Sequence, residues 1–97
     1  MRVFKARAVA GKEAELAKKL ATTSVGVVSG QAGFVGHLAG RPAETTSRDF
    51  VFITLWKDFG ALNAVFGDGW RESFLPPVYA EIIDEHSIEH YELAHGL

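Results

Sequence analysis

The chain has 97 residues, of which 47% are hydrophobic and 23% charged, and its formal net charge at pH 7 is -2. This length and balance are typical of one globular domain, so neither a second core nor extended disorder is expected. The weak negative charge offers no concentrated positive field for nucleic acid. The absence of cysteine excludes disulfides, thiolate metal sites and a cysteine nucleophile.

Size and the N-terminal segment lead to two further expectations. Charges interrupt the apolar residues between Met1 and Arg7, a pattern typical of neither a signal peptide nor a membrane span. We therefore expect a cytoplasmic protein without a membrane partner. A domain this short leaves much apolar surface uncovered, and burial against a second copy stabilises it, so we expect a homodimer.

The first half of the chain predicts a strand, a helix and a second strand. Residues 2–10 are apolar with charges at Lys5 and Arg7, a period-two pattern that favours a strand. Over residues 12–28, apolar side chains recur at steps of three and four, which predicts a helix with one buried face. Residues 33–39 favour a strand whose glycines indicate a bulge or a close backbone approach.

The second half predicts a strand, a helix and a last strand. Residues 50–56 are β-branched and aromatic, and we expect this strand to be central and buried on both faces. Asp58 is placed to cap the following helix, which the glycines of residues 67–69 end. Residues 70–75 can add one more helical turn, and residues 85–93 form the last strand.

The order of these elements, β-α-β-β-α-β, is that of the split βαβ plan. It predicts an α+β, ferredoxin-like domain with an antiparallel sheet and two helices on one face. Linkers and low-complexity tracts do not occur in the sequence, so residues 1–97 are expected to form a single domain.

Three segments in a fixed order carry a resemblance to a known family. The strand Phe52-Ile53-Thr54-Leu55-Trp56 is followed at once by Lys57-Asp58 and the helix of Ala61-Leu62. The other segments are Phe66-Gly67-Asp68-Gly69-Trp70 and Ile88-Glu89-His90-Tyr91-Glu92. Together they resemble the antibiotic-biosynthesis-monooxygenase family of dimeric α/β barrels over nearly the whole chain. The resemblance implies that two subunits pair through their helix-free sheet faces, with a pocket between the sheet and helices of each.

The resemblance also implies which strand face lines that pocket. If Trp56 points into it, as in the quinone-forming members, Phe52 and Thr54 share its face because strand side chains alternate. These residues are then candidates for binding the substrate, and Trp56 for catalysis. The alternative is that the aromatic side chains of this strand are core and nothing else.

The chain departs from the residue pattern of two branches of this family. Quinone-forming members have an asparagine four residues before the strand tryptophan and a tyrosine six residues after it, where this chain has Phe52 and Leu62. The haem-degrading branch has an asparagine on the first strand, and a tryptophan and a histidine on or just after the second helix. This chain has no asparagine on that strand, and Val65 and Leu75 in that helical region. Haem degradation by that mechanism is therefore not expected.

The spacing of His86 and His90 suggests a metal site, but the predicted strand argues against one. Residues four apart lie about 13 Å apart on a strand, against about 6 Å on a helix, so no metal is expected. Either histidine could act alone as a proton acceptor, because histidine titrates near neutrality. Each could equally be a hydrogen-bonded residue at the surface or at the dimer interface. His37, on the second strand, is a candidate for ligand contact.

Further candidates lie on the second helix and the first strand. Asn63, Phe66 and Trp70 share one helical face, and could close the pocket mouth if the helix continues through the glycines. Lys5 and Arg7 could hold an anionic substrate group, or could be edge charges that oppose sheet aggregation.

The leading hypothesis is a cofactor-independent monooxygenase that acts on a small aromatic or polyketide-like molecule. A base, His90 or His86, removes a phenolic proton, and the anion reacts with O2 to give a hydroperoxide that eliminates water. Trp56, Phe52 and Thr54 shape the pocket in this hypothesis. The alternatives are a non-catalytic small-ligand-binding or stress-associated dimer, and a protein that binds haem through one histidine.

Overall fold

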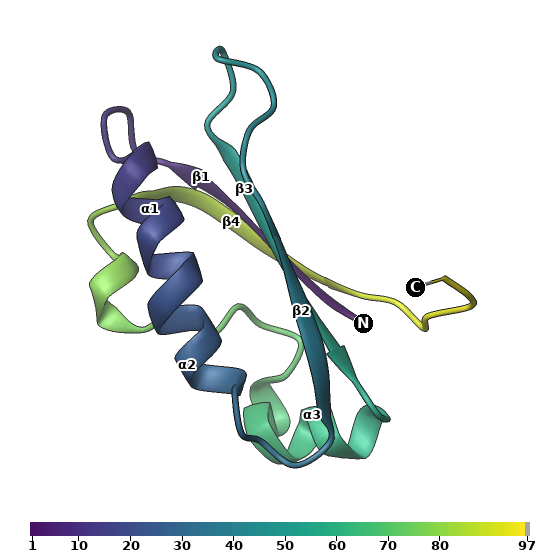
Figure 1. Ribbon diagram of the computed structural model, residues 1–97. Helices are drawn as coiled ribbons and strands as arrows, with labels where there is room; N and C mark the ends of the chain where they lie inside the picture. The colour runs from purple at the N-terminus through teal and green to yellow at the C-terminus, as the bar shows by residue number, and fades with distance from the viewer. Residues whose placement is uncertain (97) are drawn as a thin grey trace.

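The computed structural model describes residues 1–96, and it confirms the ferredoxin-like α+β fold. Four strands form one antiparallel sheet in the order β2-β3-β1-β4. Figure 1 shows α1 and α2 running along one side of this sheet, with α3 near its lower end. No helix in the described part of the chain is both long and apolar enough to cross a membrane. The bounds of the strands and helices are β1 (Arg2–Ala8), α1 (Glu13–Lys19), α2 (Val25–Val28), β2 (Phe34–Gly40), β3 (Asp49–Trp56), α3 (Phe59–Phe66) and β4 (Ile83–His90).

The helix predicted over residues 12–28 is continuous in space but not uniform. A π-helical turn, Leu20–Ser24, joins α1 to α2. Leu16, Leu20 and Val28 are buried along this helical segment, which gives it the single buried face that the apolar spacing predicts.

The strands divide the sheet into two faces, because neighbouring residues point to opposite sides. Phe4 lies directly opposite Phe52, and Val3 opposite Ile53. Phe52 belongs to the core that packs beneath the helices, whereas Val3 and Ile53 lie on the face that no described helix covers. We call this second side the open face.

Strand β3 is central, as predicted, but its two sides are buried unequally. Phe50, Phe52 and Thr54 are buried on the helix side, whereas on the open face Leu55 is buried but Val51 and Ile53 are only half-buried. Burial on both sides would therefore require a second layer over the open face.

Glycine accounts for the start of β2. Gly33 has a φ of 81°, and a Cβ at this position would overlap that of Ala61 on α3. A register shift between Phe34 and Gly36 follows immediately. The close approach and the bulge that the sequence indicates are therefore both present.

Asp58 caps α3 as predicted, because its side chain accepts a hydrogen bond from the backbone N–H of Ala61. The further helical turn over residues 70–75 was a wrong prediction. Gly67, with a φ of 66°, ends α3, and a short 3-10 turn over Gly67–Gly69 follows. The chain then continues without regular structure to Pro76.

The last strand was predicted too far along the chain. Strand β4 begins at Ile83, which pairs with Ala8 beyond a bulge in the ladder. It ends at His90 because the partner of His90 is Arg2, where β1 begins. A strand cannot extend past the end of the neighbour that supplies its hydrogen bonds.

Candidate functional site

A small cavity of about 40 Å³ lies between the helices and the sheet. Ligand pockets usually measure about 300–1,000 Å³, so this cavity is too small for a ligand as it stands, and its wall must move to admit one. Most of the lining is apolar and aromatic, and the polar groups come from four side chains. The lining residues are Arg2, Phe4, Ser24, Val27, Val28, Phe52, Thr54, Phe66, Phe74, Pro76, Tyr79 and Ile88.

Arg2 places a buried positive charge in this cavity. Only 4% of the residue is exposed, because the even positions of β1 face the helices. Its Nη1 donates to the carbonyl oxygen of Trp70 at 2.6 Å, and Nη2 donates to that of Glu72 at 3.1 Å. The guanidinium carbon lies 3.8 Å from the ring centroid of Phe66. Within residues 1–96, no carboxylate forms an ion pair with Arg2.

The environment of Arg2 offsets much of the cost of burying a cation. Removing an ion from water costs several kcal/mol. Hydrogen bonds that involve a charged group return about 1.5–3 kcal/mol each, and a desolvated cation–π contact about 2 kcal/mol. Burial lowers the pKa of Arg2 to about 10, so the side chain is still charged at pH 7. The cavity therefore holds one positive charge that no acidic side chain neutralises.

His90 lies behind Arg2, which determines its hydrogen-bonding state. Nη1 of Arg2 contacts Nε2 of His90 at 3.0 Å. Because a guanidinium can only donate, Nε2 accepts and the ring proton of neutral His90 is assigned to Nδ1. Burial, followed by the positive charge of Arg2, lowers the pKa of His90. His90 is therefore neutral at pH 7, with the lone pair of Nε2 accepting from Arg2.

Thr54 is the polar neighbour of Arg2 on β3. The two residues are directly opposite each other on β3 and β1, so their side chains emerge on the same face. Thr54 is 3% exposed, and its Oγ1 accepts a hydrogen bond from Nε1 of Trp56 at 2.9 Å. The hydroxyl proton of Thr54 remains available to a ligand, because this contact uses only a lone pair.

Tyr79 is a second buried hydroxyl, but both of its hydrogen-bonding roles are taken. Its OH donates to the carbonyl oxygen of Lys19 at 3.0 Å and accepts from the hydroxyl of Ser24. Ser24 is the last residue of the π-helical turn, Leu20–Ser24, and Lys19 directly precedes it. Burial raises the pKa of Tyr79, so its phenol stays protonated. This residue ties the helix to the loop before β4 and offers no base.

Neither the family models nor the curated proteins include a match to this sequence. Solved structures match it over nearly its whole length. A haem-degrading protein of Mycobacterium tuberculosis is 26% identical, with a TM-score of 0.56 and coverage of 100% of this chain and 99% of that one. A cofactor-independent oxygenase of Streptomyces nogalater is 22% identical, with a TM-score of 0.64 and coverage of 94% and 90%. A proposed antibiotic biosynthesis monooxygenase of Chloroflexus aurantiacus is 18% identical, with a TM-score of 0.55 and coverage of 98% and 94%. The chain has the antibiotic-biosynthesis-monooxygenase fold.

The antibiotic-biosynthesis-monooxygenase fold carries more than one chemistry, since its structures include both an oxygenase and a haem-degrading protein. The fold alone therefore does not select the reaction. The reaction must therefore be inferred from the side chains that line the cavity.

Three of the predicted ligand-binding residues, Phe52, Thr54 and Phe66, do line the cavity. Trp56 stands one layer behind them: its indole donates to Thr54, and its ring centroid lies 5.9 Å from that of Phe66. The face of β3 predicted from the antibiotic-biosynthesis-monooxygenase resemblance is therefore the one that meets the cavity.

The other predicted residues lie outside the cavity lining. Asn63 shares a face of α3 with Phe66 but does not line the cavity, and Trp70 does not continue that face because α3 ends at Gly67. The ring of Trp70 instead packs against His90, with 4.8 Å between centroids. His37 is exposed on the edge strand β2, with its ring 5.6 Å from that of Phe52.

Both candidate bases lie on β4, as the strand prediction requires, but neither lines the cavity. His86 is exposed, and its Nδ1 is 3.0 Å from the hydroxyl of Ser73. Within residues 1–96, no group of three or more histidine, aspartate or glutamate side chains could hold a metal ion.

Sequence reasoning missed several cavity residues, of which Arg2 matters most. Strand parity could have found it, because Arg2 shares its face with Phe4 and Ala6, which pack toward the helices. Nothing in the sequence marks Phe74 or Tyr79, since the chain between α3 and β4 has no periodic pattern. Their positions depend on how this connection folds back over the sheet.

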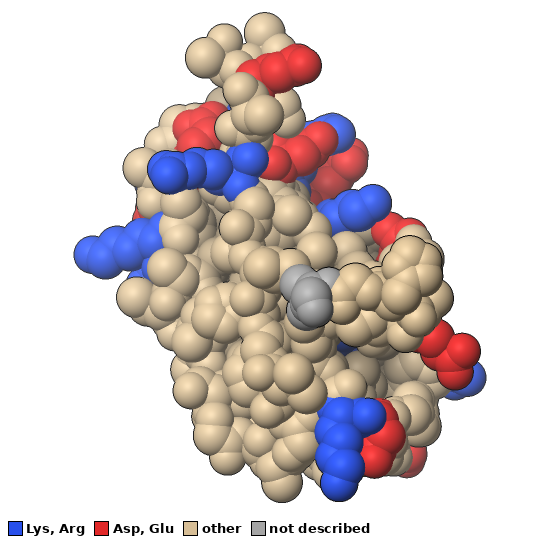
Figure 2. All heavy atoms as spheres, turned by 45° about the vertical axis from the view of Figure 1, so that its right-hand side comes forward, with Lys and Arg blue, Asp and Glu red and all other residues tan. Residues whose placement is uncertain are grey.

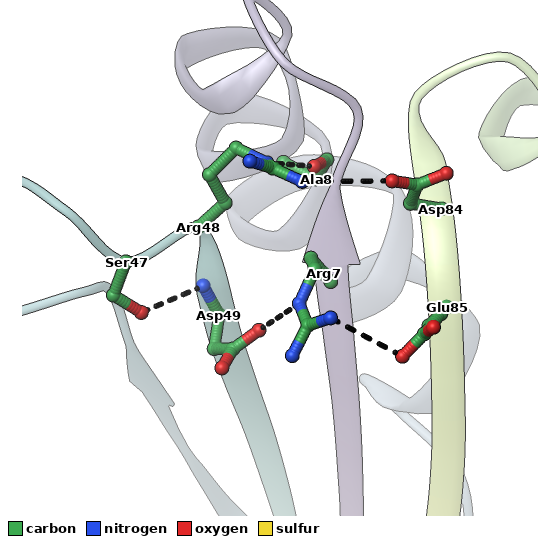
Figure 3. Close-up of polar contacts among 7 residues, drawn as sticks. All are labelled: Arg7, Ala8, Ser47, Arg48, Asp49, Asp84 and Glu85. Atoms are coloured by element: carbon green, nitrogen blue, oxygen red, sulfur yellow. Dashed lines mark hydrogen bonds and ion pairs between the residues drawn. The ribbon is translucent and has the colours of Figure 1, made fainter.

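Lys5 and Arg7 lie on the open face, beside a wide groove of about 400 Å³. Figure 3 shows Arg7 between Asp49 and Glu85, at 2.9 and 3.4 Å, and these acids raise its pKa. Lys5 pairs with Glu89 at 3.2 Å. Because β1 is an inner strand, the prediction that these are edge charges was wrong. Their charges are already matched by acids.

Proposed function

We propose that this protein binds a small aromatic molecule in the cavity between helices and sheet, and catalyses the reaction of that molecule with O2 as a homodimer. The observation that carries the proposal is the cavity lining. The rings of Phe4, Phe52, Phe66 and Phe74 surround a space with Arg2 and Thr54 at one end. Aromatic walls with polar groups at one end favour a planar ring that carries an oxygen substituent.

The proposed reaction requires no metal or flavin. The substrate is a phenol that ionises and whose anion gives an electron pair from a ring carbon to O2. A C–O bond forms, and the resulting hydroperoxide loses water, taking the hydrogen from the same carbon. One oxygen atom remains in the product as a carbonyl group and the other leaves as water. The protein contributes orientation, exclusion of water and stabilisation of the anion.

In this proposal, His90 accepts the phenolic proton. Its neutral state at pH 7 suits a base, and its Nε2 lone pair points to Arg2 at 3.0 Å. A substrate hydroxyl that displaces Nη1 of Arg2 reaches this lone pair directly. His86 is the competing candidate, and its exposed position beside Ser73 makes it the less favoured one.

The proposed dimer buries the open face. Leu38 and Val3 flank Ile53 across this face, and Leu38 is 51% exposed. Figure 2 shows charged side chains around the margins of the view and a broad area without them in the middle. The apolar part of the open face, around Leu38 and Ile53, would be stabilised by a second sheet packed about 10 Å away, whereas Lys5 and Arg7 lie beside it.

Oxygen consumption with anthrone as substrate tests the proposed function. We expect uptake above the spontaneous rate, with formation of anthraquinone. His90→Ala should lower the rate by about 100-fold or more, the usual contribution of a general base, whereas a loss confined to His86→Ala would reassign the base. Anthrone that binds but is not oxidised faster than in buffer would contradict the oxygenase proposal and favour a non-catalytic binding protein.

A further inference from the structure

We infer that the guanidinium of Arg2 is the binding site for an oxyanion attached to the aromatic ring of the ligand. The cavity then selects aromatic carboxylates and phenolates over neutral molecules of the same shape. This inference rests on the ligand pocket of the proposed function, but not on its oxygen chemistry.

The first support is the contrast between Arg2 and the other arginines. Arg7 and Arg48 each form ion pairs with aspartate or glutamate, and Arg41 and Arg71 are exposed. Arg2 alone, in the described part of the chain, is both buried and without an acidic partner. A buried cation is rarely left without a negative charge, so an anion from outside the chain suits this position.

The second support is the number of donors that remain free. A guanidinium has five N–H groups. Trp70, His90 and Glu72 engage three of them, and within residues 1–96 nothing accepts from Nε–H or from the second hydrogen of Nη2. The hydroxyl of Thr54 adds a third donor on the neighbouring strand. An oxyanion can therefore bind to these free donors while the carbonyl oxygens of Trp70 and Glu72 still hold Arg2.

The third support is the apolar wall on the other sides of the cation. The Phe66 ring lies under the guanidinium, and Phe4, Phe52 and Phe74 line the rest of the space. Phe74 is 56% exposed on a segment without regular structure, so this part of the wall can move to admit a ring. Low polarity around the site strengthens its attraction for an anion.

Binding of 2-naphthoate and 2-naphthamide to the whole protein tests the inference, because the two probes differ mainly in charge. Calorimetry should show that the wild-type protein binds 2-naphthoate at least about tenfold more tightly, as expected for hydrogen bonds between charged groups. Arg2→Met should abolish this preference. The matched control is Arg7→Met on the same strand but the open face, and it should keep the preference.

The outcomes separate the inference from the function. Equal affinities in the wild-type protein, or a preference that survives in folded Arg2→Met, would overturn the inference alone. Should Arg2→Met fail to fold, Arg2→Gln keeps hydrogen-bond donors but removes the charge, and an undiminished preference there would overturn it as well. Binding of neither probe would overturn the pocket and the inference together. A charge preference without oxygen consumption would leave the inference standing and remove the oxygenase chemistry.

Discussion

Arg2 and Arg7 lie on the same strand, yet they occupy opposite electrostatic environments. Arg2 faces the helices, where burial lowers its pKa to about 10 and no acid in residues 1–96 pairs with it. Arg7 faces the open side, where Asp49 and Glu85 raise its pKa. Arg7 is neutralised by nearby acids and solvated by water, so it attracts an anionic ligand weakly. The buried charge of Arg2 has no acidic partner in residues 1–96 and attracts such a ligand more strongly. In the proposed function, the face with Arg2 therefore serves ligand binding and the open face serves subunit association.

The largest expected contrast between the faces lies at adjacent residues of β3. Phe52→Ala should lower the free energy of unfolding by about 3–5 kcal/mol, because it opens a hole in the core beneath the helices. Ile53→Ala, on the open face, should cost less and should make Tm depend on protein concentration by weakening the dimer. Thermal melts at several concentrations check both variants. Equal losses without concentration dependence would refute the assignment of the faces.

The two tyrosines of the chain offer a smaller contrast. Tyr79→Phe should destabilise the protein by about 1–2 kcal/mol, since the carbonyl of Lys19 and the hydroxyl of Ser24 lose a buried partner. Tyr91→Phe is the matched control, because this exposed hydroxyl contacts only Glu89. We expect no measurable change in the urea midpoint of that variant. A Tyr79→Phe variant as stable as the wild type would show that the hydroxyl does not tie the helix to the loop.

The pH dependence of the free energy of unfolding should reflect the protonation of His90. Its pKa is lower in the folded protein than the ordinary 6.5, so between these two values the unfolded chain binds more protons. Stability therefore rises with pH across this window, and is lost as pH falls below about 6.5. His90→Asn should flatten the dependence of Tm on pH between 7.5 and 5. His86→Asn, on the exposed part of the same strand, should leave the wild-type slope, and the opposite pattern would contradict the placement of His90 beside Arg2.

The smallest effect is expected at the charged end of the open face. Arg7→Met removes contacts to Asp49 and Glu85 that water already screens, so we expect no measurable change in Tm. Melts at low and high salt check this. A large loss in Arg7→Met would mean that this end of the open face is buried in the dimer.

Local signals in the sequence predicted most of the fold. The β-branched and aromatic run of residues 50–56, the cap at Asp58 and the apolar spacing of residues 12–28 each correspond to an observed element. They succeeded because period, capping and glycine conformations depend on neighbours within a few residues. The last strand was misplaced because its ends are set by pairing with β1, which lies far away in sequence.

The order of strands and helices, and the residues of β3 that share a face, follow from sequence patterns, because side-chain alternation is a local property of the backbone. The site instead depends on how distant segments pack together. This packing brought Arg2, Thr54 and the loop that carries Trp70 and Glu72 together, and moved His86 out to the surface. Whether a charge is buried or paired depends on what the rest of the chain places around it. That arrangement arises from contacts between residues distant in sequence, which no local pattern records.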